Sequence, residues 1–389
     1  MKIALLPTTF LNESSESSHI TLILLARELK KKGHDVCIIS EGVKNFPEYE
    51  IFQGIKIYRG PTFSIRPDGS EVRFLNALNR IISPIMAIKK LSKRGIEFDI
   101  IHNFSAARFL ALKSLFAKRI IKNKDAKIIH TLKSYSRFKL GNKFTRLLNS
   151  SDLITVPTKR FAKDILKKGT TKTKVKVINS YIDSEKFKSI DKKIAKKKIN
   201  IKEDFILYYG GLLENKGPKI LIEAMKKVFE ENDNLKLVMI IRHKKHKIFE
   251  EYKKLMKSLN IEKKVLFIKG ELHNVEYYIN SAEIVVLPYI NLIATEGNPS
   301  CILETIACKT PLITTDLPEL REIVDYKKDV LMAKPNNVED LSKEINKLLK
   351  DKKLQKRLSE NAYKKSKEFD FKKITMKFIK LYEGLLNGS

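Results

Sequence analysis

Short apolar runs alternate with longer amphipathic segments along nearly the whole chain, and this alternation restricts the fold more than any other feature. Apolar runs separated by amphipathic helices are typical of parallel strands that are buried on both faces. The pattern therefore predicts an α/β protein with doubly wound parallel sheets. The predicted strands are 2–6, 36–39, 100–102, 127–130 and 153–156 in the first half, and 205–209, 235–241, 265–268, 284–287 and 311–314 in the second.

One stretch near the middle of the chain interrupts this alternation. The chain has 389 residues, which is enough for two hydrophobic cores. Between Asp183 and Asp204 it is rich in lysine and poor in strand signals, as expected of a linker with a short helix. We therefore predict a Rossmann-like domain over 1–183, a second one over 184–366, and a C-terminal helical segment over 367–389. Such sheets bind ligands at the carboxyl ends of their strands.

Two glutamates in the second half, Glu296 and Glu304, are eight positions apart, one in a predicted loop and one in a predicted helix. Asn298 is a favourable N-cap, and Pro299 suits the first helical position. Pro311 is expected to end the helix, because a proline cannot donate a backbone hydrogen bond. These residues predict a short helix that carries Glu304 close to its amino end.

The amino end of this predicted helix has the features of an anion-binding site. The N–H groups of Ser300 and Cys301 precede the first intrahelical hydrogen bonds and would point out of the helix. Two carboxylates beside an anion site indicate a ligand that carries both phosphate and hydroxyl groups. A nucleotide sugar has both.

These residues, together with others in the same order, resemble the motifs of glycosyltransferase family 4, the retaining enzymes of GT-B fold. Glu296 and Glu304 match the Glu-x₇-Glu motif of the family, and Pro318-Glu319 follows it. Upstream, 208–217 resembles the glycine loop of the family, and 285–288 resembles the strand before the motif. The resemblance implies two Rossmann-like domains that face each other across a cleft. It places the acceptor side in the first domain and the donor side in the second, with the last helix crossing back to the first domain.

The resemblance also implies roles for residues on the donor side. Lys216, which follows Gly210 and Gly211, would contact the donor diphosphate. Glu304 would accept hydrogen bonds from the donor ribose, and Glu296 would orient hydroxyl groups of the transferred sugar. The residues whose main chain would approach the phosphates are Gly297, Asn298, Ser300 and Cys301.

Two histidines follow predicted strands of the first domain. His130 takes the place of a histidine that in the family faces the acceptor or donor sugar. A histidine at a strand end is as often a hydrogen-bonded structural residue, so both interpretations of His130 stay open. His102 belongs to a second, similar cluster at a strand end.

The chain departs from the family pattern at two places. Gly211 stands where family members usually carry an arginine, and Arg242 is the residue that could replace its charge. The first loop, which usually contains paired glycines, has no glycine and carries Glu13 and Glu16. Both changes reduce the positive potential expected around a diphosphate.

The resemblance implies transfer of a hexose from a nucleotide-diphosphate sugar to an acceptor hydroxyl, with retention at the anomeric carbon. The front-face chemistry of the family needs neither a metal nor a cofactor. The expected acceptor is a glycan or a lipid-linked sugar. The departures favour an alternative, a weak or non-catalytic relative that binds a sugar or a partner protein. A GT-B epimerase or phosphorylase is a third interpretation, although no lysine for pyridoxal phosphate is identifiable.

The formal net charge of +32 is unevenly distributed along the chain. Residues 106–176 contain 20 Lys or Arg and three Asp, and much of this charge lies on amphipathic segments such as 109–121 and 135–148. Basic amphipathic segments bind anionic membrane surfaces. A solvated basic surface explains the same charge, and the two interpretations stay open. No nucleic-acid-binding module is recognisable, so we expect no nucleic acid partner.

Three cysteines, Cys37, Cys301 and Cys308, lie in predicted strands or helices, so we expect no disulfide framework. No Cys/His spacing resembles a metal site. No segment has the roughly 20 consecutive apolar residues that a membrane span requires. These features predict a cytoplasmic protein, attached at most to the inner face of the membrane.

Overall fold

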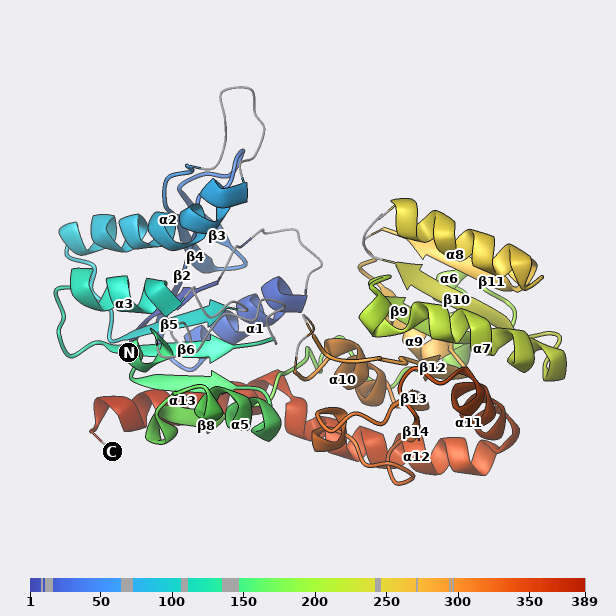
Figure 1. Ribbon diagram of the computed structural model, residues 1–389. Helices are drawn as coiled ribbons and strands as arrows, with labels where there is room; N and C mark the ends of the chain where they lie inside the picture. The colour runs from blue at the N-terminus through green and yellow to red at the C-terminus, as the bar shows by residue number, and fades with distance from the viewer. Residues whose placement is uncertain are drawn as a thin grey trace. The chain divides into compact units, whose positions relative to one another are not determined.

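In the computed structural model, the chain folds into two compact units (Figure 1). It describes residues 1–7, 10, 17–63, 73–105, 111–134, 147–241, 246–270, 272–293, 295 and 297–388. Unit 1 contains Met1–Ser180, Ala294–Gly297 and Phe371–Ser389, and unit 2 contains Tyr181–Ile293 and Asn298–Asp370. The chain passes from unit 1 to unit 2 after residue 180 and back to unit 1 after residue 370, whereas we expected these boundaries after residues 183 and 366. The short segment 294–297 also belongs to unit 1.

Unit 1 is built on an eight-stranded sheet with the order β3-β4-β2-β1-β5-β6-β7-β8. All neighbouring strands are parallel except β3 and β4, which form an antiparallel pair at one edge. The central strand β1 pairs Ile3 with Val36 on one side and with Ile100 on the other. The strands are β1 (Lys2–Leu6), β2 (Asp35–Ser40), β3 (Tyr49–Phe52), β4 (Ile55–Arg59), β5 (Ile100–Ser105), β6 (Lys127–Leu132), β7 (Leu153–Val156) and β8 (Val175–Val177).

Helices cover both faces of this sheet. Connections between parallel strands are right-handed, so α2 and α3 lie on one face and α1 on the other. The C-terminal helix α13 packs against α1. A core of Leu6, Ile101 and Ile128 from the sheet and Ile88 and Ala117 from α2 and α3 lies between the layers. The helices are α1 (Ser17–Lys31), α2 (Arg73–Lys93), α3 (Ala111–Ile120), α5 (Lys159–Lys167) and α13 (Phe371–Leu386), with the 3-10 helices η2 (Leu147–Ser150) and η3 (Lys172–Lys174).

Unit 2 is built on a six-stranded, fully parallel sheet with the order β11-β10-β9-β12-β13-β14. Its strands are β9 (Phe205–Gly210), β10 (Lys236–Ile241), β11 (Val265–Lys269), β12 (Ile284–Val286), β13 (Leu312–Thr315) and β14 (Leu331–Ala333). Its helices are α6 (Lys192–Ile199), α7 (Pro218–Glu231), α8 (His246–Ser258), α9 (Val275–Ser281), α10 (Ser300–Ala307), α11 (Val338–Lys350) and α12 (Lys352–Ser366), with the 3-10 helices η4 (Glu214–Lys216), η5 (Glu262–Lys264), η6 (Leu320–Glu322) and η7 (Lys367–Phe369).

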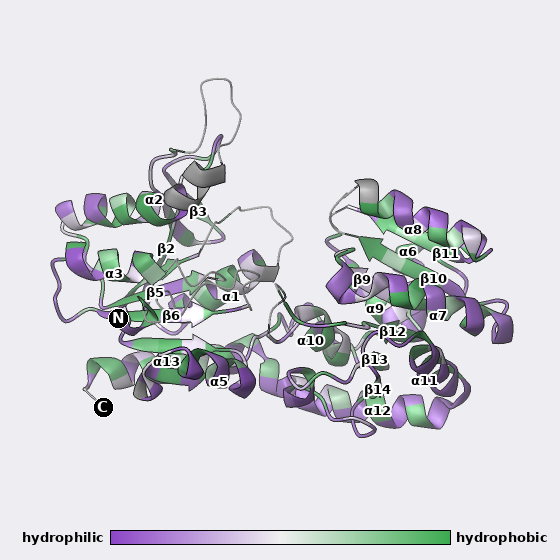
Figure 2. Ribbon diagram, viewed as in Figure 1, coloured by the Kyte–Doolittle hydropathy of each residue, from purple (hydrophilic) through white to green (hydrophobic). Residues whose placement is uncertain are grey.

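The two sheets confirm the predicted α/β fold, and all ten predicted strands are present within one to three residues at their ends. The sequence pattern missed β3, β4, β8 and β14. Residues of β3 alternate between exposed and partly buried positions, and those of β4 alternate between buried positions and more exposed ones. β8 and β14 have only three residues each, so none of the four strands forms a long apolar run. Figure 2 shows apolar residues concentrated in the sheets and polar residues on the outer helix faces.

The helices of the described residues carry too little apolar length to cross a membrane. The three cysteines are free thiols, and Cys37 and Cys308 are buried.

Candidate functional site

The glycine loop after β9 brings a lysine ammonium beside two glycines. Nζ of Lys216 lies 3.9 Å from the position that a Cβ would take on Gly210, and 3.9 Å from that position on Gly211. Gly210 has a φ of +143°, a conformation that residues with a side chain rarely adopt. The loop therefore places a partly buried cation beside partly exposed main chain.

The turn that carries Lys216 is held rigidly by its neighbours. A Cβ on Gly217 would lie 1.9 Å from the carbonyl oxygen of Pro288, so only glycine fits there. The amide of Ile290 donates to the carbonyl of Asn215 at 2.9 Å, and Nδ2 of Asn215 donates to the carbonyl of Ile293 at 2.8 Å. These contacts fix the main chain on both sides of Lys216 against the segment that follows β12.

The amino end of α10 lies one residue later than predicted. Pro299 is the N-cap residue, with φ −59° and ψ 123°, and the helix begins at Ser300. The predicted assignment of Asn298 as N-cap and Pro299 as first helical residue is therefore wrong, because Pro299 is extended and Asn298 lies before it, fully buried. The amides of Ile302 and Leu303 donate to the Pro299 carbonyl. The N–H groups of Ser300 and Cys301 thus precede the helical ladder.

The carboxyl end of α10 also differs from the prediction. The helix ends at Ala307, Cys308 is its C-cap, and Lys309 has a φ of +60°. A left-handed residue ends the helix before Pro311, so the proline is not what terminates it. The expected apolar face is confirmed, because Ile302, Leu303 and Ile306 are fully buried.

A buried tyrosine ties α10 to the end of β9. The hydroxyl of Tyr209 donates to the Cys301 carbonyl at 2.6 Å and lies 3.1 Å from Oγ1 of Thr305. Burial raises the pKa of Tyr209 well above its usual value, and the nearby carboxylate of Glu304 raises it further. Glu304 itself is partly buried. The glycine loop with its lysine and the first turns of α10 therefore meet at the carboxyl end of β9.

Gly297 belongs to unit 1 and is used there for packing. A Cβ at this position would lie 2.6 Å from Cγ of Pro157, so a side chain would clash. Its N–H, which we expected to approach the donor phosphates, instead donates to the carbonyl of Lys133 at 3.1 Å. The sequence did not reveal this contact because it joins segments that are far apart in the chain.

His130 lies inside a strand and not at its end. The predicted strand end is wrong because β6 continues to Leu132 and pairs with β5 over its whole length. The ring is fully buried, with Nε2 2.7 Å from Oγ of Ser105 and Nδ1 3.3 Å from Nδ2 of Asn103. Burial lowers the pKa of His130 to about 3, and the charge of Lys113 contributes. The imidazole is therefore neutral and lies within a hydrogen-bonded network.

His102 occupies a similar position on the neighbouring strand. Its Nδ1 lies 2.7 Å from the hydroxyl of Tyr382 on α13, and its Nε2 lies 2.6 Å from Oγ1 of Thr131. Burial lowers the pKa of His102 well below its usual value. The ring thus links β5 and β6 to the C-terminal helix of unit 1.

Lys133 is a residue that the sequence analysis did not single out. It is partly exposed just beyond β6, at the carboxyl edge of the unit 1 sheet. Its ammonium donates to Oγ1 of Thr21 near the amino end of α1 at 2.9 Å and lies 5.6 Å from the centre of the Phe104 ring. A lysine in so basic a chain carries no sequence signal, and the predicted strand ended two residues before the end of β6, so it did not place Lys133 at the sheet edge.

Two of the predicted site residues, Glu296 and Arg242, lie outside the described residues, as do Glu13 and Glu16 of the first loop. Their roles stay predictions. Among the residues that the structure does describe, no group of three His, Cys, Asp or Glu side chains is arranged to hold a metal ion.

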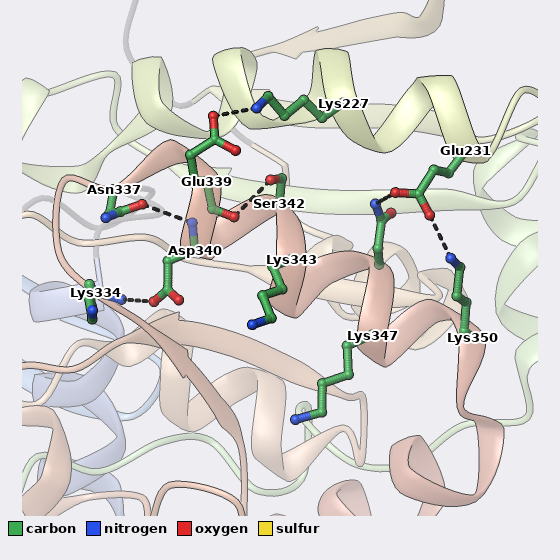
Figure 3. A pocket seen from close by; sticks show the side chains of 11 residues that line it. Lys227, Glu231, Lys334, Asn337, Glu339, Asp340, Ser342, Lys343, Lys347 and Lys350 are labelled. Atoms are coloured by element: carbon green, nitrogen blue, oxygen red, sulfur yellow. Dashed lines mark hydrogen bonds and ion pairs between the residues drawn. The ribbon is translucent and has the colours of Figure 1, made fainter.

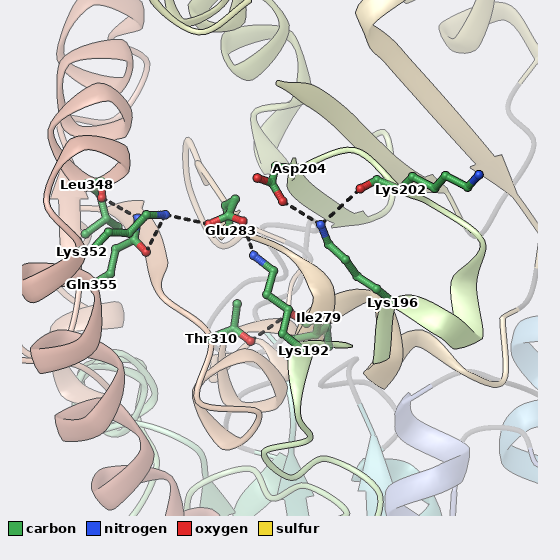
Figure 4. Close-up of polar contacts among 10 residues, drawn as sticks. All are labelled: Lys192, Lys196, Lys202, Asp204, Ile279, Glu283, Thr310, Leu348, Lys352 and Gln355. Atoms are coloured by element: carbon green, nitrogen blue, oxygen red, sulfur yellow. Dashed lines mark hydrogen bonds and ion pairs between the residues drawn. The ribbon is translucent and has the colours of Figure 1, made fainter. Parts of the chain in front are cut away.

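Unit 2 also has two hollows on its surface, and neither is lined by a predicted donor residue. One, of about 640 Å³, lies between α7 and α11 and is lined mainly by lysines and acids (Figure 3). The other, of about 790 Å³, is lined by residues before β9 and β10. Beside it Glu283 accepts hydrogen bonds from Lys192 and Lys352, and Asp204 accepts one from Lys196 (Figure 4). These ion pairs fasten α6 and α12 to the amino edge of the sheet.

Two family models match the chain, one for each half. Residues 19–186 match Glycosyltransferase Family 4, and residues 189–365 match Glycosyl transferases group 1. An uncharacterized glycosyltransferase of Methanocaldococcus jannaschii is 27% identical over 368 residues, which is 87% of each chain. An N,N'-diacetylbacillosaminyl-diphospho-undecaprenol alpha-1,3-N-acetylgalactosaminyltransferase of Campylobacter jejuni is 30% identical over 119 residues, 31% of each chain.

Solved glycosyltransferase structures share the whole fold. Sucrose-phosphate synthase from Thermosynechococcus elongatus has a TM-score of 0.79 at 18% identity over 100% of both chains. HepE of Anabaena, in complex with UDP and glucose, has a TM-score of 0.76 at 16% identity and covers 99% of this chain and 100% of its own. With both halves matched and the fold shared throughout, the chain belongs to the family 4 glycosyltransferases of GT-B fold.

Proposed function

We propose that this glycosyltransferase moves a hexose from a nucleoside-diphosphate sugar to an acceptor hydroxyl, with retention at the anomeric carbon. The observation that carries the proposal is the convergence at the end of β9. There, the ammonium of Lys216 lies beside Gly210 and Gly211, and Tyr209 binds the first turn of α10. A cation and a helix amino end at one strand end form a suitable environment for a diphosphate.

We assign each of the predicted site residues a contact with the donor. The ammonium of Lys216 and the N–H groups of Ser300 and Cys301 bind the phosphates, and Glu304 accepts hydrogen bonds from the ribose. Glu296 orients hydroxyl groups of the sugar, and Arg242 supplies the second phosphate cation in place of an arginine at Gly211. HepE supports this choice of donor, because it was crystallised with UDP-glucose.

The reaction exchanges one bond at the anomeric carbon for another on the same face. The bond to the diphosphate oxygen breaks, and a bond to the acceptor oxygen forms. The acceptor proton passes to the departing phosphate oxygen. Lys216 stabilises the negative charge that develops on the leaving group, which is the main electrostatic demand of this step. On this proposal no metal and no cofactor takes part.

The proposed acceptor is a lipid-linked sugar or a cell-surface glycan, presented at an anionic membrane on its cytoplasmic face. The Campylobacter relative supports it, since its name describes a sugar linked to diphospho-undecaprenol. The net charge of +32 supports the membrane surface.

A weak or non-catalytic relative is the alternative, and one observation favours it. Gly211 leaves the loop over β9 without the arginine charge that would accompany Lys216. Such a protein would bind a sugar or a partner protein and would not turn over a donor.

Calorimetric titration with nucleoside diphosphates, followed by a thermal-shift screen of nucleotide sugars, tests the proposal. We expect binding heat and a rise in the unfolding temperature with at least one nucleotide sugar. The anomeric configuration of the product, read by NMR, should match that of the donor, and a chelator should leave the rate unchanged. Nucleotide binding without turnover on any acceptor would favour the alternative, and absence of binding would overturn the donor site.

A further inference from the structure

Two adjacent helices of unit 1 expose apolar side chains beside basic ones. On α2 the residues Ile82, Met86, Lys89 and Lys93 follow one another at intervals of four, three and four, which places them on one stripe of the helix. Ile82 is 42% exposed and Met86 44% exposed. On α3, Phe116 is 37% exposed and is followed three residues later by the exposed Arg119. We call these six residues the α2–α3 surface.

The fold places the two helices side by side. α2 connects β4 to β5 and α3 connects β5 to β6, both in the same direction across the sheet, so both helices lie on one face and run parallel. They pack against each other (Figure 1). The basic last turns of the two helices therefore lie at the same end, with the exposed apolar side chains one to two turns before them.

The charge of this surface is of one sign. Neither α2 nor α3 contains an aspartate or glutamate. Lysines in the last turn of a helix complement its dipole, which accounts for some of the positive charge. It does not account for three large apolar side chains left in water beside that charge. A surface that combines both is suited to the boundary between lipid headgroups and acyl chains, where cations meet anionic lipids and apolar groups are buried.

We propose that the α2–α3 surface docks this protein on an anionic lipid bilayer, with Ile82, Met86 and Phe116 inserted and Lys89, Lys93 and Arg119 at the headgroups. The inference rests on the proposed function and deepens it, because it names a surface that would hold the protein on the membrane that carries the acceptor. The docking itself does not depend on catalysis and is measured without donor or acceptor.

Flotation of the full chain with lipid vesicles tests the docking. We expect binding to vesicles that contain phosphatidylglycerol, little binding to phosphatidylcholine alone, and weaker binding as salt increases. Combined Lys89→Glu, Lys93→Glu and Arg119→Glu should lower the partition coefficient about 100-fold, because each near-surface basic residue contributes roughly fivefold. Equal binding to neutral and anionic vesicles would overturn the proposal.

A matched variant separates this surface from the overall charge of the protein. Lys226→Glu, Lys254→Glu and Lys257→Glu on α7 and α8 change the net charge by the same amount, at exposed positions of unit 2. This control should bind vesicles within a few-fold of the unaltered protein. If it loses as much binding as the α2–α3 variant, the attraction is general and the assignment to this surface fails.

An apolar variant separates insertion from simple electrostatic adsorption. Ile82→Ser, Met86→Ser and Phe116→Ser keep every charge and should lower vesicle binding about tenfold, since burial of apolar groups contributes to interfacial binding. Vesicle binding equal to that of the unaltered protein would show that the apolar side chains do not insert and would overturn membrane docking. If the variant binds a DNA duplex as tightly as it binds anionic vesicles, the surface recognises polyanions in general, and membrane docking is likewise overturned. Each variant is also titrated with a nucleoside diphosphate. If the unaltered protein shows no heat of nucleoside diphosphate binding, that result counts against the proposed donor site and not against docking.

Discussion

The hydroxyl of Tyr209 donates a hydrogen bond to the main-chain carbonyl of Cys301, with 2.6 Å between the two oxygens. Cys301 lies in the first turn of α10, and Tyr209 is the last residue before the glycine loop. This one contact therefore sets the position of the helix amino end relative to Gly210 and Gly211. Oγ1 of Thr305, which lies within α10, donates to the same carbonyl at 2.7 Å, so this oxygen accepts two hydrogen bonds.

Tyr209→Phe should weaken this junction without removing the ring. We expect the free energy of unfolding to fall by about 1 kcal/mol, because Thr305 still satisfies the Cys301 carbonyl. Nucleoside diphosphate binding should weaken as well. Urea denaturation and calorimetry measure the two effects. Tyr363→Phe, at a partly exposed hydroxyl bonded to Lys367, is the control and should change neither. Normal nucleotide affinity in Tyr209→Phe would show that the junction does not position the donor.

Lys216→Met should depress turnover about 100-fold or more, because the charge that develops on the leaving diphosphate loses its ammonium. The dissociation constant of the nucleoside diphosphate should change less than the rate. Lys219→Met, three residues away and exposed beside Glu223, is the matched control. Steady-state kinetics with both variants measure the effect, and Lys216→Arg should recover part of the rate. A rate in Lys216→Met equal to that of the control would exclude Lys216 from catalysis.

Glu304→Gln should weaken donor binding by about 1–3 kcal/mol, because hydrogen bonds from the ribose to a carboxylate are lost. A deoxyribose nucleoside diphosphate tests the contact more directly. Removal of a ribose hydroxyl should weaken binding to the unaltered protein and have little further effect in the variant. Calorimetry of the four combinations gives the coupling energy. Additive losses would show that Glu304 and the ribose do not interact.

Gly217→Ala should destabilise unit 2 strongly, since a Cβ would lie 1.9 Å from the Pro288 carbonyl and φ is +72°. We expect a loss of roughly 3 kcal/mol or more in the free energy of unfolding. Gly33→Ala is matched in backbone, with φ +86° and no atom within 4 Å, and should cost about 1 kcal/mol. Denaturant unfolding of both variants measures the difference. Equal losses would mean that the approach of Pro288 does not restrict the turn.

The free energy of unfolding should decrease as the pH is lowered, in a window that the pKa of His130 defines. Its pKa is lowered from 6.5 to about 3 by burial, so between these values the unfolded chain binds a proton that the folded chain does not. Its contribution is therefore complete above about pH 6.5 and is lost as the pH falls, with a slope of about 1.4 kcal/mol per pH unit. His130→Gln should reduce that slope, whereas His273→Gln, at an exposed position, should not. Unfolding curves at several pH values measure it, and equal slopes in the two variants would contradict the neutral buried ring.

The sequence predicted the local structure around Lys216 and Glu304 better than the surroundings of the predicted residues of unit 1. Lys216 and Glu304 lie in short local motifs, a glycine loop and a helix start, whose geometry depends on residues a few positions away. Even there the helix start was off by one residue, because the local pattern favours Asn298 as N-cap and Pro299 as first helical residue, and only the observed backbone shows Pro299 outside the helix.

His130 and Gly297 show where local patterns give no information. Whether a histidine ends a strand depends on how far its neighbours continue to pair, and β6 pairs with β5 two residues beyond His130. The N–H of Gly297 could point at a ligand or at a carbonyl, and the Lys133 carbonyl that accepts it is more than 160 positions away in the chain. Neither the length of the β5–β6 pairing nor the contact between Gly297 and Lys133 can be read from the spacing of residues along the chain.

By itself, the sequence determined the class of fold, the positions of ten strands along the chain and the helix that carries Glu304. Runs of apolar residues and helix-terminating residues act over a few positions, and their periodicity is visible in one dimension. Tertiary structure decided which polar groups share a site. It brought the hydroxyl of Tyr209 to the Cys301 carbonyl, buried His130 against Ser105, placed Lys133 at the sheet edge and packed α2 against α3. These relationships arise from packing between distant segments, where burial and shape select among contacts that the local sequence allows equally.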